Sequence, residues 1–262
     1  MNLLLLMAGG DDAFREAGYV YPKNLTEIHE LPLVQRVIES LRPLIKRGNS
    51  LICCIRKEEN QQVHTGSVIR LLAPEAHIVE IDGITGGAAC TALLAVEYVN
   101  TDEPLLVING DCLLSLDLGR AIADFERRGL DGGIVVFDAV HPRWSYVKLG
   151  EADLVVETAE KRPISNLATA GVYWFARGRD FVYAATEMIR KDDQVNGQFY
   201  VCPAYNQLIL RQARIGIFRV PRQAYHSLAN PRGVRQYEDF LRTEVTHADS
   251  PTRLHDKRLV RR

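Results

Sequence analysis

The stretch Asn2-Leu3-Leu4-Leu5-Leu6-Met7-Ala8-Gly9-Gly10-Asp11-Asp12 decides the fold class of this chain of 262 residues. A short apolar run that ends in paired glycines is typical of the first parallel strand of an α/β protein and of the turn that follows it. Downstream, runs of strand length at residues 50–55, 76–81, 105–108 and 133–138 alternate with helical patterns at residues 33–41, 66–72 and 88–99. This alternation predicts a Rossmann-like, mostly parallel central sheet with helices on both faces.

The pattern changes after Asp138, where aromatic and β-branched runs follow one another across short polar turns. The expected elements are strands at residues 145–149, 154–158, 169–175 and 215–220, and helices at residues 180–190, 202–212 and 232–241. Such runs favour a small mixed or antiparallel extension of the sheet. No linker divides the chain, so we expect one domain over residues 1–245 and a basic tail over residues 246–262. A solvated end is the simpler interpretation of this tail, and a partner-binding arm is the alternative.

The composition excludes several classes of protein. Lys plus Arg number 32 and Asp plus Glu number 33, so the formal net charge is −1 and bulk charge argues against nucleic-acid binding. The apolar run from Leu3 to Ala8 is too short to span a bilayer and follows no basic segment, so we expect no membrane association and a cytosolic location. The five cysteines match no metal or redox spacing, and Cys53 and Cys54 are expected to be small buried hydrophobic residues.

The glycine turn at residues 9 and 10 is the first candidate site. Glycines allow the backbone to approach a ligand and to direct its N–H groups at anionic oxygens. A turn at the carboxyl end of a first parallel strand is also where α/β folds bind phosphate-bearing ligands. The turn matches neither of the two common phosphate-loop motifs, so a plain strand-to-helix connection is an equally good interpretation of these two glycines alone.

A series of sequence blocks follows this turn in a fixed order. The first runs from Met7 to Tyr19 and continues at residues 21–25 and 31–33, as a glycine-rich loop with an arginine, then Pro-Lys and a leucine. Later blocks lie at residues 82–91, 102–106, 109–111, 144–149, 160–165 and 196–206. Together these blocks resemble the sugar-phosphate nucleotidyltransferases, in particular the bacterial branch that activates precursors of capsule and other surface polysaccharides. The resemblance implies a Rossmann-like fold of the GT-A type.

The resemblance also implies a reaction and its partners. A phosphate oxygen of a small acceptor, such as a sugar 1-phosphate, attacks the α-phosphorus of a nucleoside triphosphate, and pyrophosphate leaves. Mg²⁺ is the implied cofactor, and catalysis consists mainly of positioning and charge stabilisation. Related enzymes often form dimers or tetramers, so the resemblance is compatible with a homo-oligomer.

The resemblance assigns nucleotide-side roles to residues that match the family's motifs. Lys23 would neutralise charge at the triphosphate as a catalytic residue, and Asp111 would hold Mg²⁺. The remaining nucleotide-binding residues would be Ala8, Gly9, Gly10, Gly86, Gly87 and Ala88. On residue type alone, a solvated loop charge is the better interpretation of Lys23, and a turn or helix-cap residue is the better interpretation of Asp111.

The acceptor side is assigned in the same way. Lys161 would be the second catalytic residue and would meet the acceptor phosphate. The other acceptor-binding residues would be Trp144, Tyr146, Glu160, Asn166 and Gly171. Without the resemblance, the Glu160-Lys161 pair would be interpreted as an exposed ion pair and the two aromatic residues as packing residues.

The chain departs from the family at the triphosphate and metal side. Ala13 stands where relatives carry an arginine that grips pyrophosphate, and Asp11 and Asp12 stand where they carry glycine and a small hydroxyl residue. A carboxylate ~4 Å from a phosphate charge costs about 4 kcal/mol at an effective dielectric constant of about 20, unless a cation lies between them. No second metal-binding aspartate is in register at residues 228–234, and Gln198 replaces an acid.

Three hypotheses follow from these departures. The first is an active nucleotidyltransferase in which additional Mg²⁺ on Asp11 or Asp12 replaces the arginine. The second is a non-catalytic ligand-binding or regulatory homologue that keeps the acceptor pocket. The third is a nucleotide-sugar-dependent transferase of the GT-A type, whose shorter phosphate chain makes acidic residues in the loop less costly.

Overall fold

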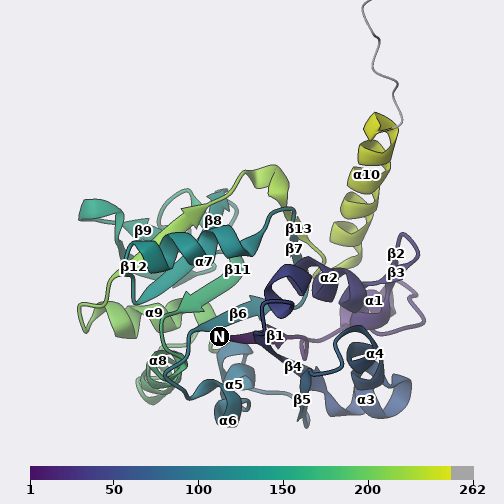
Figure 1. Ribbon diagram of the computed structural model, residues 1–262, viewed down its shortest axis with the longest axis horizontal. Coiled ribbons are helices and arrows are strands. Elements are labelled where there is room, and N and C mark those ends of the chain that lie inside the picture. The colour runs from purple at the N-terminus through teal and green to yellow at the C-terminus, as the bar shows by residue number, and fades with distance from the viewer. Residues whose placement is uncertain (249–262) are drawn as a thin grey trace, which may run out of the picture.

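Four parallel strands form one end of the central sheet (Figure 1). The computed structural model describes residues 1–248. The strands lie in the order β6 (Leu105–Asn109), β1 (Asn2–Leu6), β4 (Ser50–Arg56) and β5 (His77–Ile81), and every neighbouring pair is parallel. The leucines of β1 alternate between two hydrophobic clusters, one on each face of the sheet. The predicted Rossmann-like half is therefore confirmed.

Strand β4 shows the same two-sided burial. Cys53 and Cys54 are both fully buried and belong to opposite clusters. Burial raises the pKa of both thiols, that of Cys54 to about 12, so neither is a thiolate at neutral pH. The prediction that these cysteines act as small hydrophobic residues is confirmed.

The predicted mixed extension is part of the same sheet. Strand β11 (Leu167–Phe175) pairs antiparallel with β6, with β8 (Gly132–Asp138) and with β9 (Ser145–Leu149). The sheet, nine-stranded within residues 1–248, is completed by β10 (Val155–Glu160) and β12 (Ile215–Arg219). The strand expected at residues 133–138 runs in the same direction as β6 but does not pair with it, because the fully buried β11 lies antiparallel between them.

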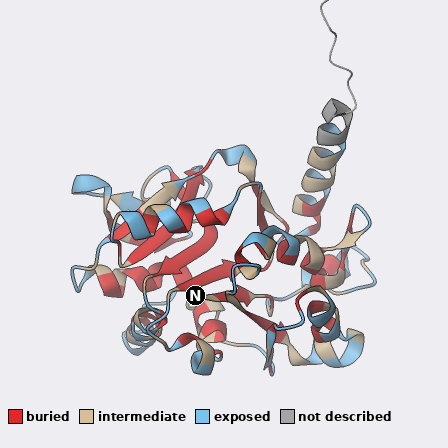
Figure 2. Cartoon of the chain, in the orientation of Figure 1, coloured by how far each residue is buried: buried red, intermediate tan, exposed pale blue. Residues whose placement is uncertain are grey.

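Helices cover both faces of the sheet, and the central strands between them are almost entirely buried (Figure 2). One face is packed by α2 (Leu33–Ile45), α4 (Thr65–Leu72) and α7 (Leu118–Arg127). The other is packed by α5 (Ala88–Leu93), α6 (Val96–Val99), α8 (Gly178–Arg190) and α9 (Val201–Ile209). The helix expected over residues 88–99 is two helices, because the chain tightens into i,i+3 turns at Leu94 and Ala95.

Several helices and strands were not predicted from the sequence, because they are too short to show a hydrophobic period. They are α1 (Asp12–Glu16), η1 (Lys23–Leu25), β2 (Glu27–Ile28), β3 (Leu31–Pro32), α3 (Lys57–Val63), β7 (Cys112–Leu114), η2 (Glu151–Asp153), η3 (Arg222–Ala224) and β13 (Tyr225–Ser227). The last described helix, α10 (Pro231–Ala248), projects from the body of the molecule (Figure 1) and runs across the boundary expected at residue 245. The basic tail residues beyond 248 lie outside the described part of the chain.

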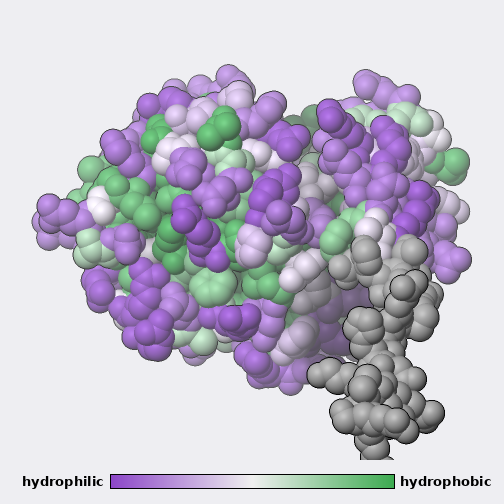
Figure 3. Space-filling model, turned by 90° about the horizontal axis from the view of Figure 1, so that it is seen from above, coloured by the Kyte–Doolittle hydropathy of each residue, from purple (hydrophilic) through white to green (hydrophobic). Residues whose placement is uncertain are grey.

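The surface seen from above is largely hydrophilic, and hydrophobic residues gather over the mixed part of the sheet (Figure 3). None of the described helices combines the length and the apolar character that a bilayer crossing requires.

Candidate functional site

The carboxyl ends of β1 and β6 approach closely because a glycine follows β6. The amide of Gly110 donates a hydrogen bond to the carbonyl of Leu6 over 2.8 Å. A Cβ at this position would lie 2.5 Å from Cγ of Met7 and 2.7 Å from the Leu6 oxygen, so no other residue fits without displacement. This approach brings Asp111 beside the glycine turn that follows β1.

Lys23 meets Asp111 at the mouth of the sheet. Its Nζ atom lies 2.9 Å from Oδ2 of Asp111, and the two side chains are 7% and 28% exposed, so their attraction is weakly screened. A Cβ at Gly9 would lie 3.3 Å from the same Nζ atom, which explains the small residue there. The burial of Lys23 is incompatible with a solvated loop charge.

A buried network holds Lys23 in place through its neighbour Asn24. Nδ2 of Asn24 donates over 3.0 Å to the carbonyl of Met7 and to the carboxylate of Glu59, which also accepts a 2.7 Å hydrogen bond from Thr65. Burial raises the pKa of Glu59, and the hydrogen bonds from Thr65 and Asn24 partly oppose this. The sequence analysis did not identify this network, because its members are far apart in the chain.

A cavity of about 560 Å³, which we call the Lys23 cavity, opens at this mouth. Most of the predicted nucleotide-side residues line it, namely Ala8, Gly9, Gly10, Lys23, Gly87, Ala88 and Asp111. Gly86 lies behind the lining, where its carbonyl accepts a 2.7 Å hydrogen bond from the amide of Phe199. The fold therefore brings almost the whole predicted nucleotide set into one space.

The acidic turn carries its own cations. Nη2 of Arg15 lies 3.0 Å from Oδ1 of Asp11 and 2.9 Å from Oδ1 of Asp12, and Nη1 of Arg56 lies 3.5 Å from Oδ1 of Asp11. Arg15 and Arg56 both line the Lys23 cavity. The sequence analysis expected repulsion between this turn and a phosphate chain unless a cation intervenes, and Arg15 and Arg56 are cations that pair with the two carboxylates.

The contacts of Arg15 and Arg56 with the acidic turn differ in how far the sequence could predict them. Arg15 follows the two aspartates by three and four residues, a spacing at which side chains meet on a helix, so the sequence contained this signal. Arg56 ends β4 and reaches the turn only because β4 pairs with β1, which residue types do not reveal.

A glycine also shapes the far wall of the Lys23 cavity. Gly87 has a φ of +120°, and a Cβ on it would lie 2.5 Å from the carbonyl oxygen of Phe199. That oxygen accepts a 3.0 Å hydrogen bond from the amide of Ala89. The turn before α5 is thereby fixed against the segment before α9, and the cavity wall there consists of small residues.

A second cavity of about 240 Å³, the acceptor cavity, adjoins the first. The two share Ala88, Asn109, Asp111 and Tyr200, so Asp111 stands at their junction. Of the predicted acceptor residues, Trp144, Glu160 and Gly171 line the acceptor cavity. Glu160 is 8% exposed and accepts a hydrogen bond from the Ser145 hydroxyl. Its burial raises its pKa, and the Ser145 hydrogen bond partly opposes the shift.

Three predicted acceptor residues lie elsewhere. Tyr146 is fully buried in the core and donates a 2.6 Å hydrogen bond to the carbonyl of His141, so the expectation that it binds the acceptor is corrected. Asn166 is exposed and donates to Asp138 over 3.0 Å, away from both cavities. Lys161 lies at the rim, where its Nζ donates over 2.7 Å to the hydroxyl of Tyr200, a residue that lines both cavities.

The donor set around Asp111 fits a magnesium ion that arrives with phosphates. Within the described part of the chain, no group of three or more His, Cys, Asp or Glu residues is arranged to hold a metal. Ser227, on β13 opposite Cys112, lines the acceptor cavity. Mg²⁺ is commonly held by one or two carboxylates together with water and substrate phosphates, so a single carboxylate such as Asp111 is compatible with this ion.

Known proteins resemble the chain in sequence and in structure. The family model described as Nucleotidyl transferase matches residues 5–202. The nucleoside-diphosphate-sugar pyrophosphorylase of Vibrio cholerae RC9 has a similar structure, with a TM-score of 0.77 and 26% identity over 92% of this chain and 99% of that chain. A UDP-glucose pyrophosphorylase solved with UDP-glucose shares the fold at 15% identity, with a TM-score of 0.70 over 93% of this chain and 98% of that chain.

Proposed function

Because the chain belongs to the nucleotidyl transferase family of enzymes, we propose that it transfers a nucleotidyl group from a nucleoside triphosphate to a small phosphorylated acceptor and releases pyrophosphate. The family resemblance inferred from the sequence blocks is confirmed by the match over residues 5–202. The observation that carries the proposal is the contact of Lys23 with Asp111 where two cavities meet. Such a junction suits two phosphate-bearing ligands that react with each other.

The proposed chemistry is an in-line displacement. A phosphate oxygen of the acceptor forms a bond to the α-phosphorus, the bond from that phosphorus to the bridging oxygen breaks, and pyrophosphate leaves with the electron pair. Lys23 provides a buried positive charge beside the reacting phosphates, and Lys161 approaches the acceptor phosphate from the rim. Glu160 and Trp144 would orient the acceptor in its cavity.

Arg15 and Arg56 would take the part of the arginine that relatives carry at the position of Ala13. Both guanidinium groups already line the Lys23 cavity, and guanidinium binds phosphate through two parallel hydrogen bonds. In this arrangement Asp11 and Asp12 hold the two arginines in position when no nucleotide is bound. An additional metal ion on the aspartates is then unnecessary.

Asp111 would be the protein ligand of Mg²⁺, because it is the carboxylate at the junction of the cavities. Bound Mg²⁺ would supply charge neutralisation along the phosphate chain. Lys23, now paired with Asp111, would then be free to turn its ammonium group to the phosphates.

An assay of pyrophosphate release tests the proposal. The purified chain is incubated with each of the four ribonucleoside triphosphates, Mg²⁺ and a panel of sugar 1-phosphates and phosphorylated amino-alcohols. Release that depends on both a triphosphate and an acceptor supports it, and no release with any pair contradicts it. Transfer from a sugar nucleotide without any triphosphate would favour the nucleotide-sugar-dependent transferase instead.

The wider role belongs to the same proposal. We propose that the reaction supplies a precursor of capsule or another surface polysaccharide in the cytosol, because the sequence blocks resemble that branch of the family. Deletion of the gene should lower the pool of one nucleotide-activated precursor and reduce the matching surface polysaccharide. Unchanged pools and an unchanged polysaccharide would contradict this role.

A further inference from the structure

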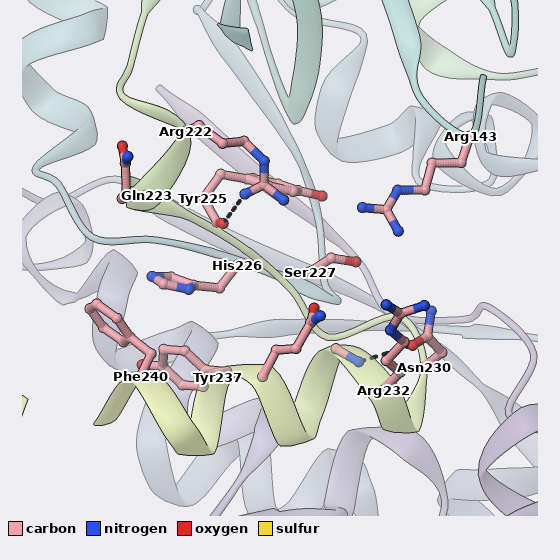
Figure 4. A pocket seen from close by; sticks show the side chains of 12 residues that line it. Arg143, Arg222, Gln223, Tyr225, His226, Ser227, Asn230, Arg232, Tyr237 and Phe240 are labelled. Atoms are coloured by element: carbon pink, nitrogen blue, oxygen red, sulfur yellow. Dashed lines mark hydrogen bonds between the residues drawn. The ribbon is translucent and has the colours of Figure 1, made fainter. Parts of the chain in front are cut away.

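A third cavity, of about 510 Å³, continues the acceptor cavity between β13 and α10 (Figure 4). We call it the Arg222 cavity. It shares Arg143, Tyr225 and Ser227 with the acceptor cavity and no lining residue with the Lys23 cavity. The three spaces therefore follow one another, and the acceptor cavity is the middle one. A molecule in the middle space has Asp111 at one end and the Arg222 cavity at the other.

The charge of the Arg222 cavity has one sign. Arg143, Arg222 and Arg232 line it, and no Asp or Glu is present among its described lining residues. In Figure 4 the three guanidinium groups come from different segments and point into a common space. None of these arginines forms an ion pair with a residue of the described chain, whereas Arg15 and Arg56 in the Lys23 cavity do. Three unpaired guanidinium groups around one space favour an anion there.

Two of the three arginines, Arg222 and Arg143, are held in place by contacts that do not neutralise their charge. Nη1 of Arg222 donates over 2.9 Å to the carbonyl of Tyr225, and its guanidinium lies 5.0 Å from the ring centre of Phe137. The guanidinium of Arg143 lies 4.4 Å from the ring centre of Trp144. Stacking on aromatic rings orients a guanidinium and leaves its outer N–H groups available to a ligand.

The rest of the lining suits the uncharged part of a small molecule. Tyr237 and Phe240 of α10 form an aromatic side of the cavity, against which the ring of His226 packs at 4.8 Å and 4.5 Å. Gln223 and Gln236 add amide groups that can bind hydroxyl or carbonyl oxygens. Binding cavities commonly combine such apolar walls with a few polar groups that fix orientation.

We propose that the acceptor carries a second anionic group, a carboxylate or a phosphate, remote from the phosphate that reacts, and that Arg143, Arg222 and Arg232 bind this group. The inference rests on the proposed function for the use of the acceptor cavity. It narrows the substrate class from any small phosphate to one with two anionic ends. It also gives a use to α10, which the proposed reaction alone does not require.

Binding of chemically simple probes tests this inference without knowledge of the natural acceptor. Isothermal titration calorimetry measures α,ω-alkanediol bisphosphates, from ethanediol to octanediol, against the matched alkyl monophosphates. At least one bisphosphate is expected to bind the wild-type chain about tenfold or more tightly than its monophosphate. This affinity ratio should fall toward unity in Arg232→Gln and in Arg222→Gln. Arg232 is exposed and makes no ion pair with a described residue, so its variant should fold even if Arg222→Gln does not.

Arg70→Gln is the matched control, because it removes the same charge from an exposed position on α4 outside all three cavities. The inference is supported if the affinity ratio of bisphosphate to monophosphate is unchanged in this control and falls toward unity in Arg232→Gln. No preference for any bisphosphate in the wild type, or an undiminished preference in Arg232→Gln, overturns it.

Inorganic phosphate is the probe for a separate effector site. If inorganic phosphate binds the wild type as tightly as the best bisphosphate does, and Arg232→Gln abolishes this binding, the cavity takes a free anion and the inference is overturned. The pyrophosphate-release assay is read separately. If the chain shows the affinity ratio but releases no pyrophosphate, the proposed function is contradicted. The inference that the cavities bind a molecule with two anionic ends then still stands.

Discussion

The two ends of the acceptor cavity bind charge in different ways. Three cations line the Lys23 cavity, namely Lys23, Arg15 and Arg56. Each of them already has a carboxylate partner within the described chain. At the Arg222 end the guanidinium groups of Arg143 and Arg222 stack on aromatic rings, and the cavity lining there contains no described carboxylate. A paired cation gains little from an anion unless its partner is displaced or neutralised, as Mg²⁺ at Asp111 would do. The Lys23 end is therefore suited to a ligand that brings a metal, and the Arg222 end to a plain anion.

The largest expected effect comes from removal of the charge at the Lys23 end. Lys23→Met keeps a long apolar side chain but leaves Asp111 without its partner and the reacting phosphates without a fixed cation. We expect kcat for pyrophosphate release to fall by about 10²–10³. Lys57→Met, which removes an exposed lysine outside the cavities, is the control. A Lys23→Met enzyme with wild-type kcat would show that the cavity junction is not the reaction centre.

Disruption of the backbone contact that creates this end should have the next largest effect. In Gly110→Ala the new Cβ would overlap Met7 and the Leu6 carbonyl, so the ends of β1 and β6 must move apart. We expect the free energy of unfolding in urea to fall by about 1–3 kcal/mol. Gly10→Ala is the comparison, because its Cβ would find no atom closer than 3.6 Å and should cost little. Equal stabilities of the two variants would contradict the importance of this contact.

A smaller and more selective effect is expected at Arg56. Arg56→Gln removes one of the two guanidinium groups proposed to bind the triphosphate and leaves the acceptor cavity untouched. KM for the nucleoside triphosphate should rise about tenfold, with KM for the acceptor unchanged. Glu160→Gln should show the reverse, because Glu160 lines only the acceptor cavity. If both variants raise the same KM, the division between the two ends is wrong.

The sequence predicted the fold class because it depends on local signals. The apolar run from Leu3 to Met7 must be buried on two faces, and a glycine turn after such a strand marks the edge where ligands bind. Motif order then identified Lys23 and Asp111. What could not be predicted depends on pairing between distant strands, such as the contact of Arg56 with Asp11 and the place of β11 beside β6.

The error at Tyr146 has a specific physical origin. Successive residues of a strand face opposite sides of a sheet, so either Ser145 or Tyr146 had to point toward Glu160. The family resemblance assigned Tyr146 to the acceptor, whereas residue type alone favoured packing, and Tyr146 is indeed fully buried. The hydroxyl of Ser145 donates to Glu160 instead. Which of two adjacent residues faces a cavity is decided by strand register, which a single sequence does not reveal.

The smallest expected effect concerns the buried carboxylate behind Lys23. Because burial raises the pKa of Glu59 above its value in the unfolded chain, the folded state binds a proton more readily. The stability that this difference contributes is fully present below the unfolded-state pKa, about 4.3, and is lost as the pH rises through the folded-state pKa. Gln at this position cannot titrate. The free energy of unfolding of Glu59→Gln should therefore increase relative to that of the wild type as the pH rises from about 4 to about 8.

Urea unfolding of both proteins across this pH range measures the difference, and Glu75→Gln at an exposed position is the control, for which we expect no such trend. The same pH series also bears on the comparison of the two ends. Glu59 accepts the hydrogen bonds that hold Asn24 beside Lys23, so its protonation weakens the support of the Lys23 end and leaves the Arg222 end unaffected. Bisphosphate preference at the Arg222 end should then be the same in Glu59→Gln as in the wild type. A loss of that preference in Glu59→Gln would mean that the two ends are coupled through the sheet.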